Sequence, residues 1–264
     1  MKLIDCLLRE FPELDRKTAT GLIMRGDVLI DDRAVTSPAL ELHGGRIRIR
    51  GEIHRSESRG KAKLAPALEA SGMDCEDRVC MDLGAADGGF TRVLLEAGAA
   101  KVYAVDVAYG VLAAELRNDE RIIVLERTNA RLLGKEQVPE PVGRIVGDLS
   151  FISWSAVLPA VLGVAASDAE LLLLVKPQFE LAAAGRDDLL EQGIVTSHTA
   201  IRDCLAELLA TWQNNGVEPH GVFRAGITGR KGNQEYFVHL LRGAGGNLNA
   251  YLELIDKALM GVSG

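Results

Sequence analysis

Hydrophobic positions in the first 53 residues follow two different periods. Leu3, Leu7 and Phe11 are spaced as on one face of a helix, and a second helical pattern ends at Gly26. In the segment 46–50, isoleucines alternate with arginines, which places the isoleucines toward a core and the arginines toward solvent. We therefore expect a small α+β domain over residues 1–53.

Strand and helix patterns alternate from residue 63 onward. In chain order we expect the strand 79–83, the helix 88–97, the strand 102–106, the helix 111–118, the strands 122–125 and 145–148, the helix 155–166, the strand 171–175, the helix 197–214, and two apolar segments, 221–225 and 236–241, that complete one side of the sheet. Alternation of this kind is typical of a parallel sheet with helices on both faces. The sequence predicts an α/β domain with a Rossmann-like sheet over residues 63–243.

Two segments lie outside these patterns. The run 51–59 is polar and has no apolar period, so we interpret residues 54–62 as a linker. Residues 248–260 have an amphipathic pattern, which predicts a helix within a C-terminal tail, residues 244–264.

The composition excludes several classes of protein. With 47% hydrophobic and 25% charged residues, the 264-residue chain is neither disordered nor a coiled coil. No apolar run approaches the roughly 18 residues of a membrane span, and the start of the chain lacks the features of a secretory signal. The four cysteines show neither C-x-x-C spacing nor a histidine cluster. We expect a cytoplasmic protein with no membrane span, disulfide framework or metal site.

Charge is distributed unevenly along the chain. The formal net charge is −7, yet residues 1–63 carry +3 and the remainder −10, and seven lysines and arginines fall within residues 46–63. Such a basic stripe is typical of a surface that binds RNA phosphates, although ordinary solvated surface charge explains it equally well. The candidate RNA-binding residues are Arg46, Arg48, Arg50, Arg55 and Arg59.

A glycine-containing loop follows the strand 79–83. Asp82 lies at the end of this strand, Gly84 and Gly88 follow it, and Asp106 ends the next strand, where an acid can accept hydrogen bonds from both hydroxyls of an adenosine ribose. The G-x-x-x-G spacing does not form the pyrophosphate cradle of a dinucleotide site, so it favours S-adenosylmethionine over NAD. An ordinary strand-to-helix turn explains one or two glycines but not the paired acids.

Two charged residues at further strand ends are candidates for the chemistry. Asp148 ends the strand 145–148, and Lys176 follows a buried apolar strand directly before Pro177. The Asn/Asp-Pro-Pro-aromatic motif of amine methylation and the Pro-Cys nucleophile of carbon methylation are both absent from the sequence. A hydroxyl group is the remaining methyl acceptor, with Lys176 as the candidate base.

Several of these segments together resemble one enzyme family, the TlyA family of ribosomal-RNA methyltransferases, a branch of the FtsJ-like 2'-O-ribose methyltransferases. The segments that carry the resemblance are Ser58–Leu64, Asp82–Phe90, Glu126–Asn129, Asp148–Ser153, Leu174–Glu180 and Gly232–Phe237. The segment Leu22–Ile30 resembles the small RNA-binding domain named after ribosomal small-subunit protein four, which such proteins carry before the methyltransferase domain.

The resemblance implies a Lys-Asp-Lys-Glu tetrad that catalyses 2'-O-methylation of cytidine in ribosomal RNA, with ribosomal RNA or ribosomal subunits as the partner. The matching residues are Lys63, Asp148, Lys176 and Glu235. In this family the second lysine assists loss of the 2'-hydroxyl proton, and two lysines among two carboxylates can leave one amine free to accept it. Together, the strand-end positions and the matching motifs give the candidate S-adenosylmethionine residues Asp82, Gly84, Asp87, Gly88, Phe90, Asp106, Asn129 and Asp148.

The sequence departs from the family pattern in two places, and two other functions compete with methyl transfer. The chain begins Lys2-Leu3-Ile4-Asp5 where an Arg-Leu-Asp start is usual, and residues 181–186 replace a Gly/Lys-rich loop, which bears on substrate positioning. Some family members are labelled hemolysins, so a membrane-active protein is one rival. The other is an RNA-binding ribosome assembly factor without catalytic activity.

Overall fold

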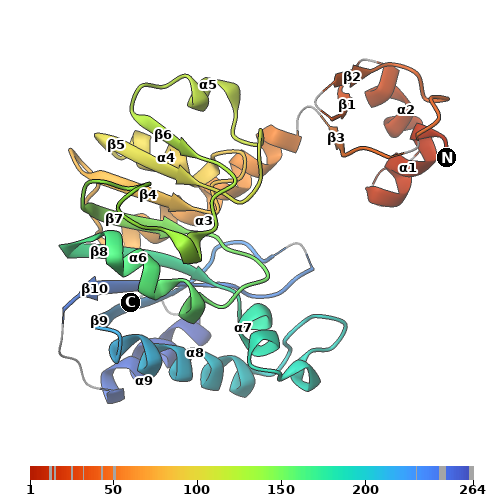
Figure 1. The fold of residues 1–264 in the computed structure, drawn as a ribbon. Helices are drawn as coiled ribbons and strands as arrows, with labels where there is room; N and C mark the ends of the chain where they lie inside the picture. The colour runs from red at the N-terminus through yellow and green to blue at the C-terminus, as the bar shows by residue number, and fades with distance from the viewer. Residues whose placement is uncertain are drawn as a thin grey trace. The chain divides into compact units, whose positions relative to one another are not determined.

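The computed structural model describes residues 1–11, 14, 16–24, 26–31, 33–42, 44–49, 52–229, 231–243 and 248–261. It divides into two compact units, residues 1–57 and 58–264 (Figure 1). The division falls inside the range predicted as a linker.

The first unit combines two helices with a three-stranded sheet. Its elements are α1 (Leu3–Glu10), α2 (Arg16–Met24), β1 (Val28–Ile30), β2 (Arg33–Val35) and β3 (Ile47–Ile49). The antiparallel strand order is β2-β1-β3, and the buried isoleucines of β3 pack with Leu3, Leu7 and Ile23 in one core. The predicted inward orientation of these isoleucines is confirmed, whereas β2 has too little apolar pattern to be predicted.

The segment predicted as a linker is helical in the structure, so the prediction of its conformation is wrong. Residues 54–62 lie within the helix α3 (Glu52–Ser71), which contains Pro66. The segment consists largely of charged and small residues, and a helix of such composition has no apolar stripe in its first half. Because the prediction relied on apolar periodicity, it missed the helix.

The second unit is built on a seven-stranded sheet in the order β6-β5-β4-β7-β8-β10-β9. The strands are β4 (Val79–Leu83), β5 (Lys101–Val105), β6 (Ile122–Leu125), β7 (Val142–Gly147), β8 (Ala165–Val175), β9 (Val217–Arg224) and β10 (Tyr236–Arg242). The first five are parallel, and β10 runs antiparallel to both β8 and β9. The predicted parallel sheet and its completion by two late segments are confirmed.

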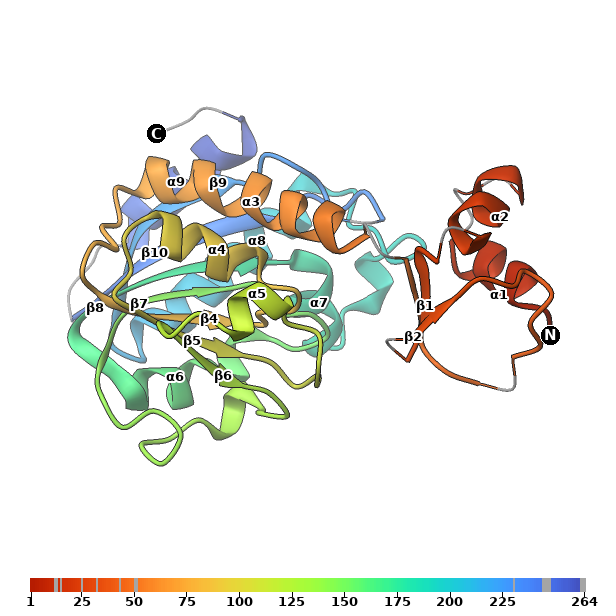
Figure 2. The ribbon, with the colours of Figure 1, turned by 90° about the horizontal axis from the view of Figure 1, so that it is seen from above.

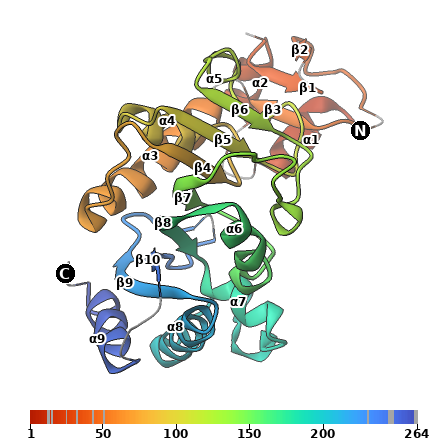
Figure 3. The ribbon, with the colours of Figure 1, turned by 60° about the vertical axis from the view of Figure 1, so that its left-hand side comes forward.

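Helices cover both faces of this sheet, as Figure 2 shows. They are the part of α3 in this unit, α4 (Gly89–Glu96), α5 (Ala114–Arg117), α6 (Leu158–Val164), α7 (Pro177–Ala183), α8 (His198–Gln213) and α9 (Leu248–Leu259). Alternate strand residues serve the two cores: Ile145 and Leu173 pack with α6 and α8, whereas Val146 and Leu172 pack with α3 and α4. The predicted C-terminal helix is α9, which packs against α8 and β9 (Figure 3).

Two helix predictions need correction. Of the expected helix 111–118 only Ala114–Arg117 is helical, because Glu126 accepts the Gly110 N–H (2.9 Å) and holds the preceding segment as a loop. The expected helix 155–166 divides into a 3-10 turn, Trp154–Ala156, and α6, after which β8 begins at Ala165, six residues earlier than predicted. Exposed polar residues in the first half of β8 concealed its strand pattern.

Candidate active site

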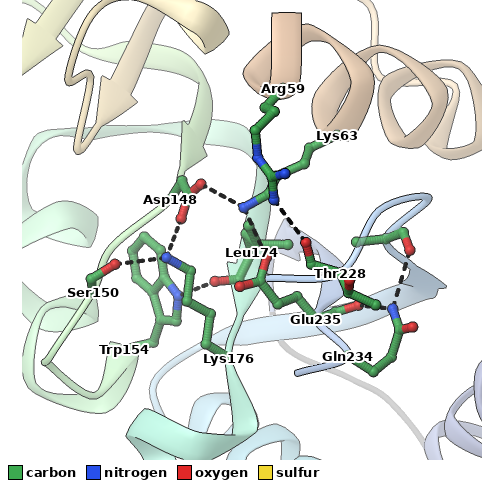
Figure 4. Close-up of polar contacts among 11 residues, drawn as sticks. Arg59, Lys63, Asp148, Ser150, Trp154, Leu174, Lys176, Thr228, Gln234 and Glu235 are labelled. Atoms are coloured by element: carbon green, nitrogen blue, oxygen red, sulfur yellow. Dashed lines mark hydrogen bonds and ion pairs between the residues drawn. The ribbon is translucent and has the colours of Figure 1, made fainter. Parts of the chain in front are cut away.

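Strand register brings four charged side chains to the carboxyl edge of the parallel sheet. Asp148 directly follows β7, and its N–H bonds to the Leu83 carbonyl at the end of β4 (2.9 Å). Because β10 is antiparallel to β8, with Tyr236 opposite Val175, the residue before β10 and the residue after β8 meet at this edge. These residues are Glu235 and Lys176, and α3 contributes Lys63 (Figure 4).

The four side chains form a continuous polar cluster. Lys63 Nζ lies 2.8 Å from Glu235 Oε2 and 3.1 Å from Asp148 Oδ2. Lys176 Nζ lies 2.5 Å from Asp148 Oδ1. Asp148 is therefore shared between two lysines, whereas Glu235 pairs with Lys63. The structure thus brings together all four residues that the resemblance placed in one tetrad.

Burial makes these contacts electrostatically strong. The side chains of Lys63 and Lys176 are only 10% and 9% exposed, and that of Asp148 is 24% exposed. Burial acts to raise the pKa of Asp148, but the positive charges of Lys176 and Lys63 outweigh burial and lower it. Asp148 is therefore ionised, and its two lysine partners limit the cost of burying this charge.

The segment after Asp148 is held against α7 by a buried carboxylate. Glu180 accepts the Trp154 N–H (3.0 Å), while the Trp154 indole donates to the Leu174 carbonyl (2.9 Å). Burial raises the pKa of Glu180, opposed by its hydrogen bonds from Ser153 and Trp154. These bonds fix residues 148–154 relative to Lys176.

An aromatic pair lies beside Lys176. Phe151 is 88% exposed, and its ring packs on Phe179, with ring centroids 4.7 Å apart. The Phe179 centroid is 5.7 Å from Lys176 Nζ. Phe151 has a φ of +63°, which is strained for a bulky side chain. An exposed flat ring next to a buried lysine can stack on a base.

The glycine loop approaches Asp148 closely. At Gly84 (φ +82°), a Cβ atom would lie 2.7 Å from the carbonyl oxygen of Asp148, so only glycine fits. The Asp106 carboxylate at the end of β5 is fixed by the N–H groups of Ala86 and Ala108, each at 2.8 Å, and is partly exposed. Its remaining lone pairs can accept hydrogen bonds from the hydroxyls of a ligand.

Two of the predicted cofactor residues also have structural roles. Phe90 is 4% exposed and packs against Phe237 in the core. Gly88 adopts φ +100°, and a Cβ atom there would collide with Leu116, so packing already requires a glycine. Packing explains why these residues occupy both positions, and their contact with a cofactor stays a prediction.

The other predicted cofactor residues differ in exposure. Asp82 is fully buried and accepts a hydrogen bond from Thr91 Oγ1 (2.7 Å). Asn129, partly exposed, caps the 3-10 turn Ala130–Leu132 by accepting the Arg131 N–H. Asp87 is half-buried next to the loop. Contact of these three with a cofactor stays a prediction.

The match to known proteins covers most of the second unit. Residues 56–242 match the model of the FtsJ-like methyltransferases. The chain belongs to this family. Members are named for methyl transfer, which agrees with the glycine loop and the polar cluster at one edge of the sheet.

Relatives of this FtsJ-like methyltransferase carry two kinds of name. This chain is 41% identical over 236 residues to the 16S/23S rRNA (cytidine-2'-O)-methyltransferase TlyA of Mycobacterium tuberculosis. The matched region covers 89% of this chain and 87% of the relative. The chain is 33% identical to Hemolysin A of Brachyspira hyodysenteriae over 86% of this chain and 93% of the relative. A solved structure from Streptococcus thermophilus, also named a hemolysin, matches with a TM-score of 0.73 and 29% identity over 99% of this chain and 96% of that one.

The predicted RNA-binding arginines of this FtsJ-like methyltransferase are only partly described. Arg46 is exposed and Arg48 half-buried on β3. Arg59 is exposed, and its guanidinium donates to the Thr228 carbonyl (2.9 Å), one turn of α3 from Lys63 (Figure 4). Arg50 and the side chain of Arg55 lie outside the described residues.

The described residues offer neither a cluster of metal ligands nor a membrane-spanning helix. No group of three or more His, Cys, Asp or Glu side chains there could hold a metal ion. No helix in the same part of the chain has the length and apolar composition to cross a bilayer.

Sequence reasoning gave no role to four residues around Lys176 in this FtsJ-like methyltransferase. They are Ser150, Phe151, Phe179 and Glu180. All four lie inside motifs that carried the family resemblance, and an aromatic residue placed in a polar loop was the available signal. Their mutual contacts depend on where α7 packs, which no sequence pattern specifies.

Proposed function

We propose that the protein transfers a methyl group from S-adenosylmethionine to the 2'-hydroxyl of a cytidine in ribosomal RNA, and that it acts in the cytoplasm where that RNA lies. The observation that carries this proposal is the cluster of Lys63, Asp148, Lys176 and Glu235 at the carboxyl edge of the sheet. The name of the relative at 41% identity supports the RNA substrate and the cytidine target.

The residues near the glycine loop fit S-adenosylmethionine. Asp106 offers a fixed, partly exposed carboxylate to a ribose diol, and Gly84 leaves room where a Cβ atom would clash with the backbone of Asp148. Asp82 Oδ1 is buried with no hydrogen-bond partner in the described part of the chain, so it can accept a bond from an ammonium group. The chemistry that S-adenosylmethionine supplies when bound is an electrophilic methyl group on a positively charged sulfur.

The two lysines of the tetrad have different roles in activating the ribose 2'-hydroxyl. Lys63 lies between two carboxylates, so it fixes Asp148 and Glu235 in place. Lys176 has a single carboxylate partner, which it shares with Lys63. Of the two lysines, Lys176 is the one that can accept the 2'-hydroxyl proton at Nζ, so that the ribose oxygen attacks as the O–H bond breaks.

Phe151 and the basic residues position the RNA in this proposal. A target ribose reaches a buried lysine only if its nucleotide leaves the stacked helix, and an exposed aromatic ring compensates for lost stacking. Phe151 is exposed and packed on Phe179 beside Lys176. Arg46 and Arg59 supply positive charge for phosphate contacts.

Methyl transfer to purified ribosomal subunits tests the proposal. The protein is incubated with subunits and S-adenosylmethionine carrying a tritiated methyl group, and modified nucleotides are identified by mass spectrometry. We expect 2'-O-methylcytidine in ribosomal RNA with the natural chain and none with Lys176→Ala. Binding of subunits without any methylation would favour an assembly factor, and leakage of dye from lipid vesicles without methylation would favour a hemolysin.

A further inference from the structure

Lys176 has a second hydrogen-bond partner outside the tetrad. Its Nζ donates to Ser150 Oγ at 2.7 Å, in addition to the ion pair with Asp148 Oδ1 at 2.5 Å. Figure 4 shows both contacts converging on the amine from the segment that follows β7. Ser150 is exposed, whereas the Lys176 side chain is 9% exposed. A buried amine is thus held partly by a serine that lies at the surface of the site.

We propose that Ser150 is a positioning residue that orients the amine of Lys176 for proton transfer, an inference that rests on the proposed function. A lysine nitrogen has three tetrahedral directions besides its bond to Cε. Asp148 and Ser150 occupy two of them, and the third remains for the oxygen of the substrate. With Asp148 alone, the amine would be free to rotate about the Cε–Nζ bond, and the remaining direction would not be fixed.

Lys176 differs from Lys63 because its second partner, the Ser150 hydroxyl, carries no charge. Both partners of Lys63 are carboxylates, Asp148 and Glu235. At Lys176 the second partner is a hydroxyl, which orients the amine without adding a negative charge. A carboxylate at position 150 would keep the geometry but hold the proton on Lys176, and a base that keeps its proton cannot accept another.

The protein fixes the place of Ser150 from both sides. Phe151, the next residue, packs on Phe179, and Trp154 is bonded through its N–H to Glu180 and through its indole to Leu174. Because Lys176 directly precedes α7, and Phe179 and Glu180 lie in α7, the serine and the lysine are attached to one local framework. The 2.7 Å separation between Lys176 Nζ and Ser150 Oγ is therefore imposed by these surrounding contacts. It is not the chance position of a surface side chain.

Three substitutions at one position test the inference by methyl transfer. Ser150→Ala should lower kcat about 10- to 100-fold, the scale of lost orientation, with affinity for S-adenosylmethionine and KM for RNA within about twofold. Ser150→Thr keeps the hydroxyl and should retain kcat within about threefold. Ser150→Asp should lose at least about 100-fold, as expected for a disabled base. The matched control Ser167→Ala changes an exposed serine of β8 and should have no effect.

A second measurement does not depend on methyl transfer. In protein labelled with ¹³C at lysine Cε, the Lys176 resonance is assigned by its loss in Lys176→Arg, and it should move in Ser150→Ala but not in Ser167→Ala. An unmoved resonance, a normal kcat for Ser150→Ala, or full activity of Ser150→Asp would each overturn the positioning role. If the natural chain methylates no RNA, the proposed function fails, and the resonance still decides whether Ser150 orients Lys176.

Discussion

Replacing Lys176 by alanine and by arginine tests whether this residue acts as a proton acceptor or as a positioning charge. Lys176→Ala removes one ion pair, but Asp148 keeps Lys63 at 3.1 Å, so its carboxylate does not become an unpaired buried charge. The side chains of the lost pair are 9% and 24% exposed, between the buried and exposed cases, so we expect a loss of about 1–3 kcal/mol in folding stability. The protein should remain folded and bind S-adenosylmethionine.

The effect on the rate should be much larger than the effect on stability. A positioned acid–base group contributes about 10²- to 10⁴-fold, which corresponds to about 3–5 kcal/mol of transition-state stabilisation. Lys176→Arg keeps the positive charge and a partner for Asp148, yet a guanidinium does not give up its proton in a protein. We therefore expect Lys176→Arg to be nearly as inactive as Lys176→Ala.

The assay is single-turnover methyl transfer to ribosomal subunits, with melting temperature measured for every variant. Lys101→Arg is the matched control, because Lys101 forms an ion pair with Glu140 at the opposite end of the parallel strands. Lys63→Arg should lose less activity than Lys176→Arg, since Lys63 acts in this proposal through its charge. A Lys176→Arg enzyme with at least half the natural rate would refute the proton-acceptor role and leave Lys176 as a positioning charge.

Further predictions concern the cofactor, the core and the RNA. Asp106→Ala should weaken S-adenosylmethionine binding about 10- to 150-fold, the scale of hydrogen bonds to a charged group, and unchanged affinity by calorimetry would contradict the assignment. Burial raises the pKa of Asp82 from 3.8 to about 7, against its hydrogen bond from Thr91. The folded state therefore binds a proton that the unfolded state releases between about pH 4 and 7, so stability falls as pH rises through this range, by up to about 4 kcal/mol. Asp82→Asn should remove this dependence in urea titrations, and an unchanged pH profile would show that Asp82 ionises normally. Phe151→Ala should reduce kcat/KM for RNA about 5- to 150-fold without changing cofactor affinity, as loss of one stacked base predicts, and a normal value would exclude stacking. Arg46→Gln should lower the slope of log Kd for RNA against log salt by about one if this arginine contacts a phosphate, and an unaltered slope would leave it as solvated surface charge.

The elements that sequence patterns predicted well are those whose burial is uniform along their length. The strand 79–83 matches β4 at both ends, because it is buried on both faces and bounded by polar turns. The glycine loop after it was equally clear, since Gly84 needs both a positive φ and close approach to the backbone. Elements with a polar segment were misjudged, as the polar start of α3 and the first half of β8, with its exposed Ser167 and Asp168, show.

The tetrad was predicted by resemblance rather than by pattern. Lys63 and Glu235 are separated by 172 positions in the sequence, and no periodicity relates a residue of a helix to one before a late antiparallel strand. Their 2.8 Å contact follows from the strand order β7-β8-β10 together with the packing of α3 over that part of the sheet. Sequence alone identified Asp148 and Lys176 as candidates because each ends a parallel strand, a general property of sites in open sheets.

Backbone strain at the candidate site is a further property that the sequence pattern did not reveal. Ala86, Arg127 and Phe151 have φ values of +50°, +53° and +63°, and each lies in the loop after a parallel strand, β4, β6 and β7. Such a conformation costs about 1–3 kcal/mol for a residue with a side chain, and persists only where surrounding contacts impose it. At Phe151 those contacts include the packing of its ring on Phe179. A relaxed backbone would release the strain, whereas the strained one keeps the Phe151 ring 88% exposed and packed on Phe179, whose ring lies beside Lys176. Folding stability gives no reason to expose a phenylalanine in this way, and in the proposed reaction the exposed ring contacts the base of the methylated nucleotide.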